Sequence, residues 1–149
     1  MVGIGPDITG KFHPKVILTL QGVGAWLAVN GEAIYGTRPW KLFGEGPTEV
    51  AEGAFTDTNR TAFTGEDVRF TTKGDVLYAI LLAWPESGIA TIRSLGRSTG
   101  LYTGEIHTIT LLGDNNESLA FTQGDDALTV TLPETKPCDH AFVLKITAG

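Results

Sequence analysis

The feature of this chain that most limits its fold is a change of hydrophobic period between Asn30 and Trp40. Before this stretch, apolar residues recur at the spacing of a helix, and after it they alternate at the spacing of strands. Within it, Asn30-Gly31 predicts the end of a helix, while Gly36 and Pro39 predict a short connector. The stretch therefore predicts a junction between a helical part and a strand-rich part.

The helical part is predicted over Pro14–Asn30, because proline suits a first helical position and apolar residues follow at helical spacing. Those residues are Val16, Leu20, Val23 and Leu27, with Ile17, Leu18 and Trp26 widening the stripe. Gly22 and Gly24 each cost a helix about 1 kcal/mol relative to alanine, so its stability must come from packing. The broad apolar coverage predicts contacts on more than one side of the helix.

After Trp40, turn residues separate short alternating segments, a pattern typical of an antiparallel all-β domain. The strand candidates are Val50–Thr56, Val68–Lys73, Val76–Trp84, Ile89–Ser94, Ile106–Leu112, Ser118–Gln123, Ala127–Leu132 and Ala141–Ile146. Lys41–Glu49 is interpreted as a connector. Val76–Trp84 is continuously apolar, which predicts a central strand covered on both faces. The expected fold class is mainly β: an antiparallel β-sandwich of about eight strands, Greek-key or jelly-roll-like, preceded by one α-helix.

Charge and composition narrow the classes of partner. The formal net charge is −6, and the basic residues are scattered along the chain. This argues against a nucleic-acid or anionic membrane surface. No apolar run reaches the length of a membrane span, and residues 1–6 lack the features of a signal peptide. We therefore expect a soluble, untargeted chain and leave its compartment open.

Motifs for nucleophilic or metal chemistry are weak. Gly96–Gly100 matches the G-x-S-x-G pattern around Ser98, but a strand-like segment follows where a nucleophile elbow needs a helix, so we interpret it as a turn. The histidines, His13, His107 and His140, are far apart and have no metal-ligand spacing. Cys138 is the one cysteine and is expected to be a buried structural thiol. We predict no catalytic residue, no metal site and no cofactor.

Two acidic clusters, Asp114–Glu117 and Asp125-Asp126, fall between predicted strands and are interpreted as solvated turns. A structural calcium ion in such an oxygen-rich loop is the alternative.

Three aromatic residues are candidates for stacking against sugar rings: Trp40, Trp84 and Tyr102. Trp84 precedes a turn and Tyr102 lies in a glycine-flanked loop, so both could be accessible. Packing in the core is the competing interpretation, because aromatic side chains dominate cores of this size.

Several segments together resemble the C-terminal part of the α-L-fucosidases of glycoside hydrolase family 29. They are Ile4–Asp7, Trp26–Trp40, Val68–Gly74 and Leu77–Ile80. The resemblance implies that residues 1–40 are the last strand, helix and linker of a (β/α)₈-like catalytic barrel, and that residues 41–149 are a C-terminal β-sandwich. It also implies a retaining enzyme whose aspartate nucleophile and acid/base carboxylate match no residue of this chain.

On this resemblance, the function expected is that of an accessory and stability domain, inactive alone, in a fucosidase that acts on fucosylated glycans. A barrel of about 250 residues cannot be built from 40, so the chain is expected to be a truncated product, a split gene or a partial clone. A freestanding carbohydrate-binding module is the alternative. With no barrel to cover it, the Pro14–Asn30 helix is expected to drive self-association.

Overall fold

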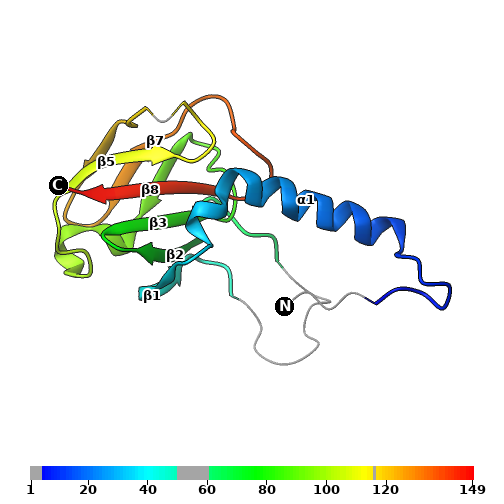
Figure 1. The fold of residues 1–149 in the computed structure, drawn as a ribbon. Coiled ribbons are helices and arrows are strands. Elements are labelled where there is room, and N and C mark those ends of the chain that lie inside the picture. The colour runs from blue at the N-terminus through cyan, green and yellow to red at the C-terminus, as the bar shows by residue number, and fades with distance from the viewer. Residues whose placement is uncertain (1–4, 50–60, 116) are drawn as a thin grey trace.

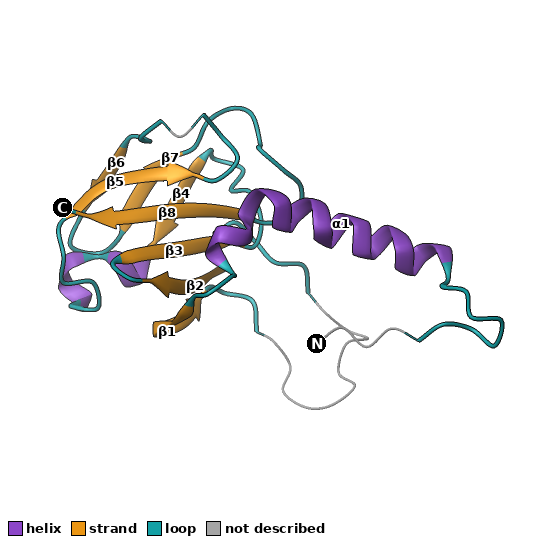
Figure 2. Ribbon diagram, in the orientation of Figure 1, coloured by secondary structure: helices purple, strands orange, loops and turns teal. Residues whose placement is uncertain are grey.

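Two antiparallel sheets pack face to face, and one long helix extends from the sandwich that they form (Figure 1, Figure 2). The structure is a computed structural model and describes residues 5–49, 61–115 and 117–149. Its elements are α1 (Pro14–Asn30), η1 (Gly31–Ala33), β1 (Arg38–Glu45), β2 (Val68–Lys73), β3 (Val76–Leu81), β4 (Ile89–Ile92), η3 (Arg93–Leu95), η4 (Arg97–Thr99), β5 (Ile106–Leu111), β6 (Phe121–Gln123), β7 (Leu128–Thr131) and β8 (Phe142–Ala148), where η marks a 3₁₀ turn. The predicted fold class, a mainly β sandwich preceded by one helix, is confirmed.

The larger sheet has the strand order β1-β2-β3-β8-β5, and the smaller one has the order β4-β7-β6. All neighbouring strands are antiparallel. The strand β3 pairs along its whole length with β2 on one side and β8 on the other. The prediction of a central strand here is therefore confirmed.

The main core lies between the two sheets. Because side chains alternate across a strand, every second residue of each strand enters this core. The larger sheet contributes Leu77 and Leu144, and the smaller one contributes Ile92 and Val130; all four are fully or almost fully buried.

The other face of β3 is also covered, as predicted, and the junction that follows α1 provides this cover. Tyr78 and Ile80 point to this face and form a second buried cluster with Ala33 of η1 and Val143 of β8. Trp26 of α1 packs against the same cluster. The C-terminal end of the helix is thereby attached to the outside of the larger sheet.

The interpretation of Lys41–Glu49 as a connector was wrong, because most of it belongs to β1. This strand begins at Arg38, lies at an edge of the sheet, and changes register with β2 between Pro39 and Gly44. An edge strand tolerates the proline and the irregular register, which together hide the alternating pattern.

The prediction of Val68–Lys73 matches β2 at both ends, and the other described strands hold in position but differ at their ends. β3 stops at Leu81 rather than Trp84, and β4 stops at Ile92 because the chain enters η3. β5, β6 and β7 are shorter than predicted, and β8 runs on to Ala148. The candidate strand Val50–Thr56 lies outside the described residues.

The helix α1 has its predicted bounds. His13 caps it, since its Nδ1 accepts a hydrogen bond from Lys15 N at 3.2 Å. At the other end Gly31 keeps a right-handed conformation and opens η1, and the chain takes a left-handed turn at Gly36, with φ 70°.

The prediction of contacts on more than one side of α1 was wrong for the described residues. The helix points away from the sandwich (Figure 1), and Asn30 is its single buried residue. Among the described residues, no helix has the length and apolar character needed to span a bilayer.

Candidate functional site

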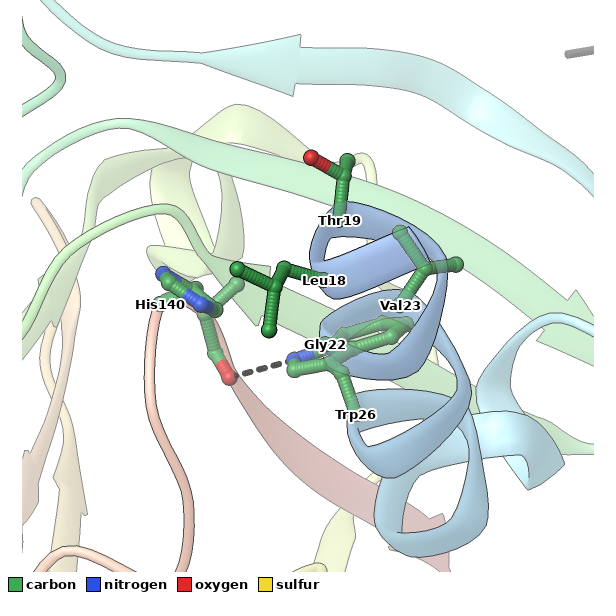
Figure 3. Close-up of a pocket in the computed structure, with 7 residues that line it drawn as sticks. Leu18, Thr19, Gly22, Val23, Trp26 and His140 are labelled. Atoms are coloured by element: carbon green, nitrogen blue, oxygen red, sulfur yellow. Dashed lines mark hydrogen bonds between the residues drawn. The ribbon is translucent and has the colours of Figure 1, made fainter. Parts of the chain in front are cut away.

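An apolar hollow of about 560 Å³ lies between α1 and the residues that lead into β8 (Figure 3). Its walls are Leu18, Thr19, Gly22, Val23, Trp26, His140 and Ala141. Leu18, Gly22 and Trp26 are four residues apart, so they lie above one another on one face of the helix. Gly22 supplies no side chain to that face, and the hollow opens where a side chain would stand.

The inner end of the hollow is held by hydrogen bonds between α1 and the chain before β8. Trp26 Nε1 donates to Ala141 O at 2.7 Å (Figure 3). Asn30 Nδ2 of α1 donates to Cys138 Sγ at 3.4 Å, and Cys138 Sγ in turn donates to Ala141 O at 3.3 Å. The thiol is half-buried, so the expectation of a fully buried cysteine was wrong, although both of its hydrogen bonds lie within this junction.

At the outer end of the hollow, apolar side chains of α1 are exposed to solvent. Leu18 is 67% exposed, and Ile17, Leu20 and Val23 are each more than 40% exposed. Single exposed apolar side chains are ordinary, but these four lie within two turns of one helix and are spread around much of its circumference, so this segment offers apolar surface on several sides to a partner. We call these four residues, together with the hollow, the α1 face.

The α1 face is fixed to the sandwich through a polar clamp at η1. Glu32 Oε1 accepts a hydrogen bond from Tyr78 Oη at 2.8 Å and pairs with Lys145 Nζ at 2.6 Å. Thr71 Oγ1 donates to Ala33 O at 2.7 Å. The partner side chains come from β2, β3 and β8, so the clamp spans three strands.

The clamp changes the acidity of its members. The hydrogen bond from Lys145, and then that from Tyr78, lower the pKa of Glu32 below its ordinary value. Burial, and then the hydrogen bond to Glu32, raise the pKa of Tyr78 well above its ordinary value. Glu32 is therefore charged and Tyr78 neutral at physiological pH.

The three predicted sugar-stacking aromatics lie at different places. Trp40 of β1 packs against Phe70, with ring centroids 4.9 Å apart. Trp84 packs edge-on against Phe142 at 4.7 Å, where β8 begins. Tyr102 lies in the loop before β5, near the other end of β8. All three are half-buried against the core between the sheets, so the structure does not bring them together in one binding surface.

The other candidate groups occupy structural positions. Ser98 Oγ donates to Asp125 O at 2.7 Å, and the turns η3 and η4 take the place where an elbow would need a long helix. His13 caps α1, His107 is exposed on β5, and His140 adopts a left-handed conformation with φ 74° beside the hollow. In the part of the chain that the structure describes, no three His, Cys, Asp or Glu side chains come together as a metal site.

Comparison with known proteins identifies the family to which the sandwich belongs. Residues 61–147 match the family model of the alpha-L-fucosidase C-terminal domain. The tissue alpha-L-fucosidase of Homo sapiens is 32% identical to this chain, and that of Rattus norvegicus is 33% identical. Each match covers 99% of this chain and 28% of the relative's length. The crystal structure of Thermotoga maritima alpha-fucosidase in complex with a mechanism-based inhibitor has the same fold, with a TM-score of 0.72 at 23% identity, over 99% of this chain and 30% of that one.

The chain belongs to the α-L-fucosidase family, glycoside hydrolase family 29, and its sandwich is that family's C-terminal domain. It spans about 28% of the length of the curated relatives that it matches. The resemblance found in the sequence is confirmed.

Proposed function

We propose that this chain acts as the accessory C-terminal part of a retaining α-L-fucosidase, and that it does not itself cleave fucosides. The catalytic nucleophile and acid/base carboxylate of that enzyme would lie outside these 149 residues. The substrates would be fucosylated glycans, bound by the catalytic part.

The observation that carries this proposal is the α1 face. The clamp and Trp26 hold one end of α1 rigidly on the sandwich, while Leu18 and its neighbours stand exposed. A helix with exposed apolar side chains and no cover is stabilised when another part of the molecule packs on it. The relatives contain more than two thirds of their length beyond the part that this chain matches, which supports a catalytic region as that cover.

The first test is hydrolysis by the purified chain alone. We expect no release of nitrophenol from an aryl α-L-fucoside above the rate in buffer, because hydrolysis with retention needs two paired carboxylates. Hydrolysis at an enzymatic rate, retained through successive purification steps, would overturn the proposal.

The second test places the chain in a working enzyme. In a chimera, this chain replaces the matched C-terminal part of the human tissue relative, and activity on the aryl fucoside is measured with its thermal midpoint. Leu18→Asp puts a charge on the α1 face and is expected to lower both the activity and the thermal midpoint of the chimera. Thr103→Asp adds the same charge to an exposed residue of the loop before β5, outside α1, and is expected to change neither the activity nor the thermal midpoint. Equal effects of the two variants would contradict docking through this face.

A further inference from the structure

Three adjoining hollows run along the edge of the sandwich, away from the α1 face. Their volumes are about 220, 350 and 280 Å³. The first two share Glu45 and Gly46, and the last two share Glu66, Thr91 and Arg93. Because each hollow shares lining residues with the next, the three are neighbours, and we call them together the edge groove.

An exposed aromatic ring stands at one end of the edge groove. Phe43 is 74% exposed, and Arg69 lies over it with its guanidinium carbon 5.4 Å from the ring centroid. Arg69 is positioned further by Phe63, at 5.8 Å, and by its hydrogen bond to Val68 O at 2.9 Å. A side chain at Gly44 would collide with Val68 O and Arg69, so this arrangement requires glycine there.

The middle of the groove joins the two sheets rigidly. The Glu45 carboxylate accepts hydrogen bonds from Arg93 N and Ser94 N, each at 2.7 Å. This carboxylate connects the end of β1 in one sheet to η3, which follows β4 in the other. The two walls of the groove are therefore preorganised, which lowers the cost of binding.

Exposed polar groups of both signs line the rest of the groove. Arg93 and Glu66 are 3.6 Å apart and 75% and 62% exposed, so their pairing is weak and a ligand can replace it. Thr91 lines the same two hollows and adds a hydroxyl group to them. No cluster of basic side chains lines these three hollows, so the groove does not suit a polyanion.

We propose that the edge groove binds a neutral oligosaccharide. One sugar ring stacks on Phe43, and the hydroxyl groups of the following sugars bond to Glu66, Thr91 and Arg93. An exposed ring beside donors and acceptors suits a ligand that has an apolar face and many hydroxyl groups. This goes beyond the proposed function, because it concerns glycan held by the sandwich itself, apart from any hydrolysis.

The test is titration of the isotope-labelled 149-residue chain, separately with fucosyllactose and with cellopentaose. NMR locates the site and calorimetry measures affinity. We expect at least one sugar to shift the backbone amides of Gly44, Gly46 and Thr91 at millimolar concentration. Phe43→Ala should raise Kd about five- to tenfold, since it removes the stacking surface.

The matched control is Phe12→Ala, which removes a phenylalanine that is 47% exposed ahead of α1. It should leave Kd unchanged. The proposal is overturned if neither sugar shifts the groove amides, or if Phe43→Ala binds as tightly as the control. The readout is binding by the chain alone, so this result is independent of whether the chimera hydrolyses a fucoside.

Discussion

At the scale of single residues, Asp67 shows how one buried carboxylate organises a surface. Asp67 is fully buried just before β2. Its two oxygens accept hydrogen bonds from Thr48 N at 3.0 Å, Thr48 Oγ1 at 2.7 Å, Thr64 N at 2.7 Å and Thr64 Oγ1 at 2.9 Å. A single side chain thus ties together two parts of the chain that are distant in sequence.

Burial acts to raise the pKa of Asp67, but the hydrogen bonds from Thr64 and Thr48 outweigh it, so its pKa lies below its ordinary value. A carboxyl group whose pKa is lowered by folding stabilises the folded state above its unfolded pKa. That stabilisation is lost as the pH falls through the folded pKa. The charge on Asp67 therefore supports the fold at neutral pH and not in strong acid.

We expect Asp67→Asn to lower the free energy of unfolding by about 2–3 kcal/mol at neutral pH, because the amide nitrogen cannot accept hydrogen bonds and leaves donors unsatisfied. Urea unfolding measures this, with Asp75→Asn, an exposed residue between β2 and β3, as control. The difference between Asp67→Asn and the parent chain should shrink in acid. A difference that stays constant down to strong acid would contradict a lowered pKa of Asp67 in the folded chain.

At the scale of elements, the clamp around Glu32 decides how α1 meets the sandwich. The turn η1 is only three residues long, yet it contacts β2 through Thr71, β3 through Tyr78 and β8 through Lys145. Glu32 remains partly exposed, with 42% of its side chain accessible, so water screens its pairing with Lys145. The hydrogen bond to buried Tyr78 is accordingly the stronger contribution.

We expect Glu32→Gln to lower the free energy of unfolding by about 0.5–1 kcal/mol. A double-mutant cycle with Tyr78→Phe should give a coupling energy of at least about 0.5 kcal/mol, because the two side chains share one hydrogen bond. Glu134→Gln, at an exposed position before β8, serves as the control and should be neutral. Strictly additive effects of Glu32→Gln and Tyr78→Phe would contradict the clamp.

At the scale of the whole molecule, the α1 face has no cover among the described residues. We propose that copies of the isolated chain associate through this face, because burying exposed Leu18, Ile17, Leu20 and Val23 is favourable. The association would be reversible and would increase with concentration by mass action.

Light scattering over a range of concentrations checks this proposal. The mean mass of the parent chain should rise with concentration, and Leu18→Asp should return it to that of a monomer. Thr103→Asp, in the loop before β5, is the control and should associate like the parent. A monodisperse monomer at every concentration would contradict self-association.

Much of the fold follows from local pattern. The helix bounds, the central place of β3 and the positions of most strands along the chain could be predicted, because each rests on the spacing of apolar residues along one segment. The strand β1 could not, since an edge strand with a proline and a register change lacks that spacing. The candidate site was harder still: no local pattern connects Glu32 to Tyr78, or Phe43 to Arg69.

The sequence by itself determined the class of this protein: a helix, a junction at Asn30–Trp40 and a β-sandwich of the fucosidase family. These follow from periodicity and from residues adjacent in the chain. Only the tertiary structure decided that the junction covers the outer face of β3, that Trp40, Trp84 and Tyr102 pack inward, and that Phe43 stands exposed. The physical reason is that exposure depends on which distant segments pack on a residue, and that is a property of the assembled sheets.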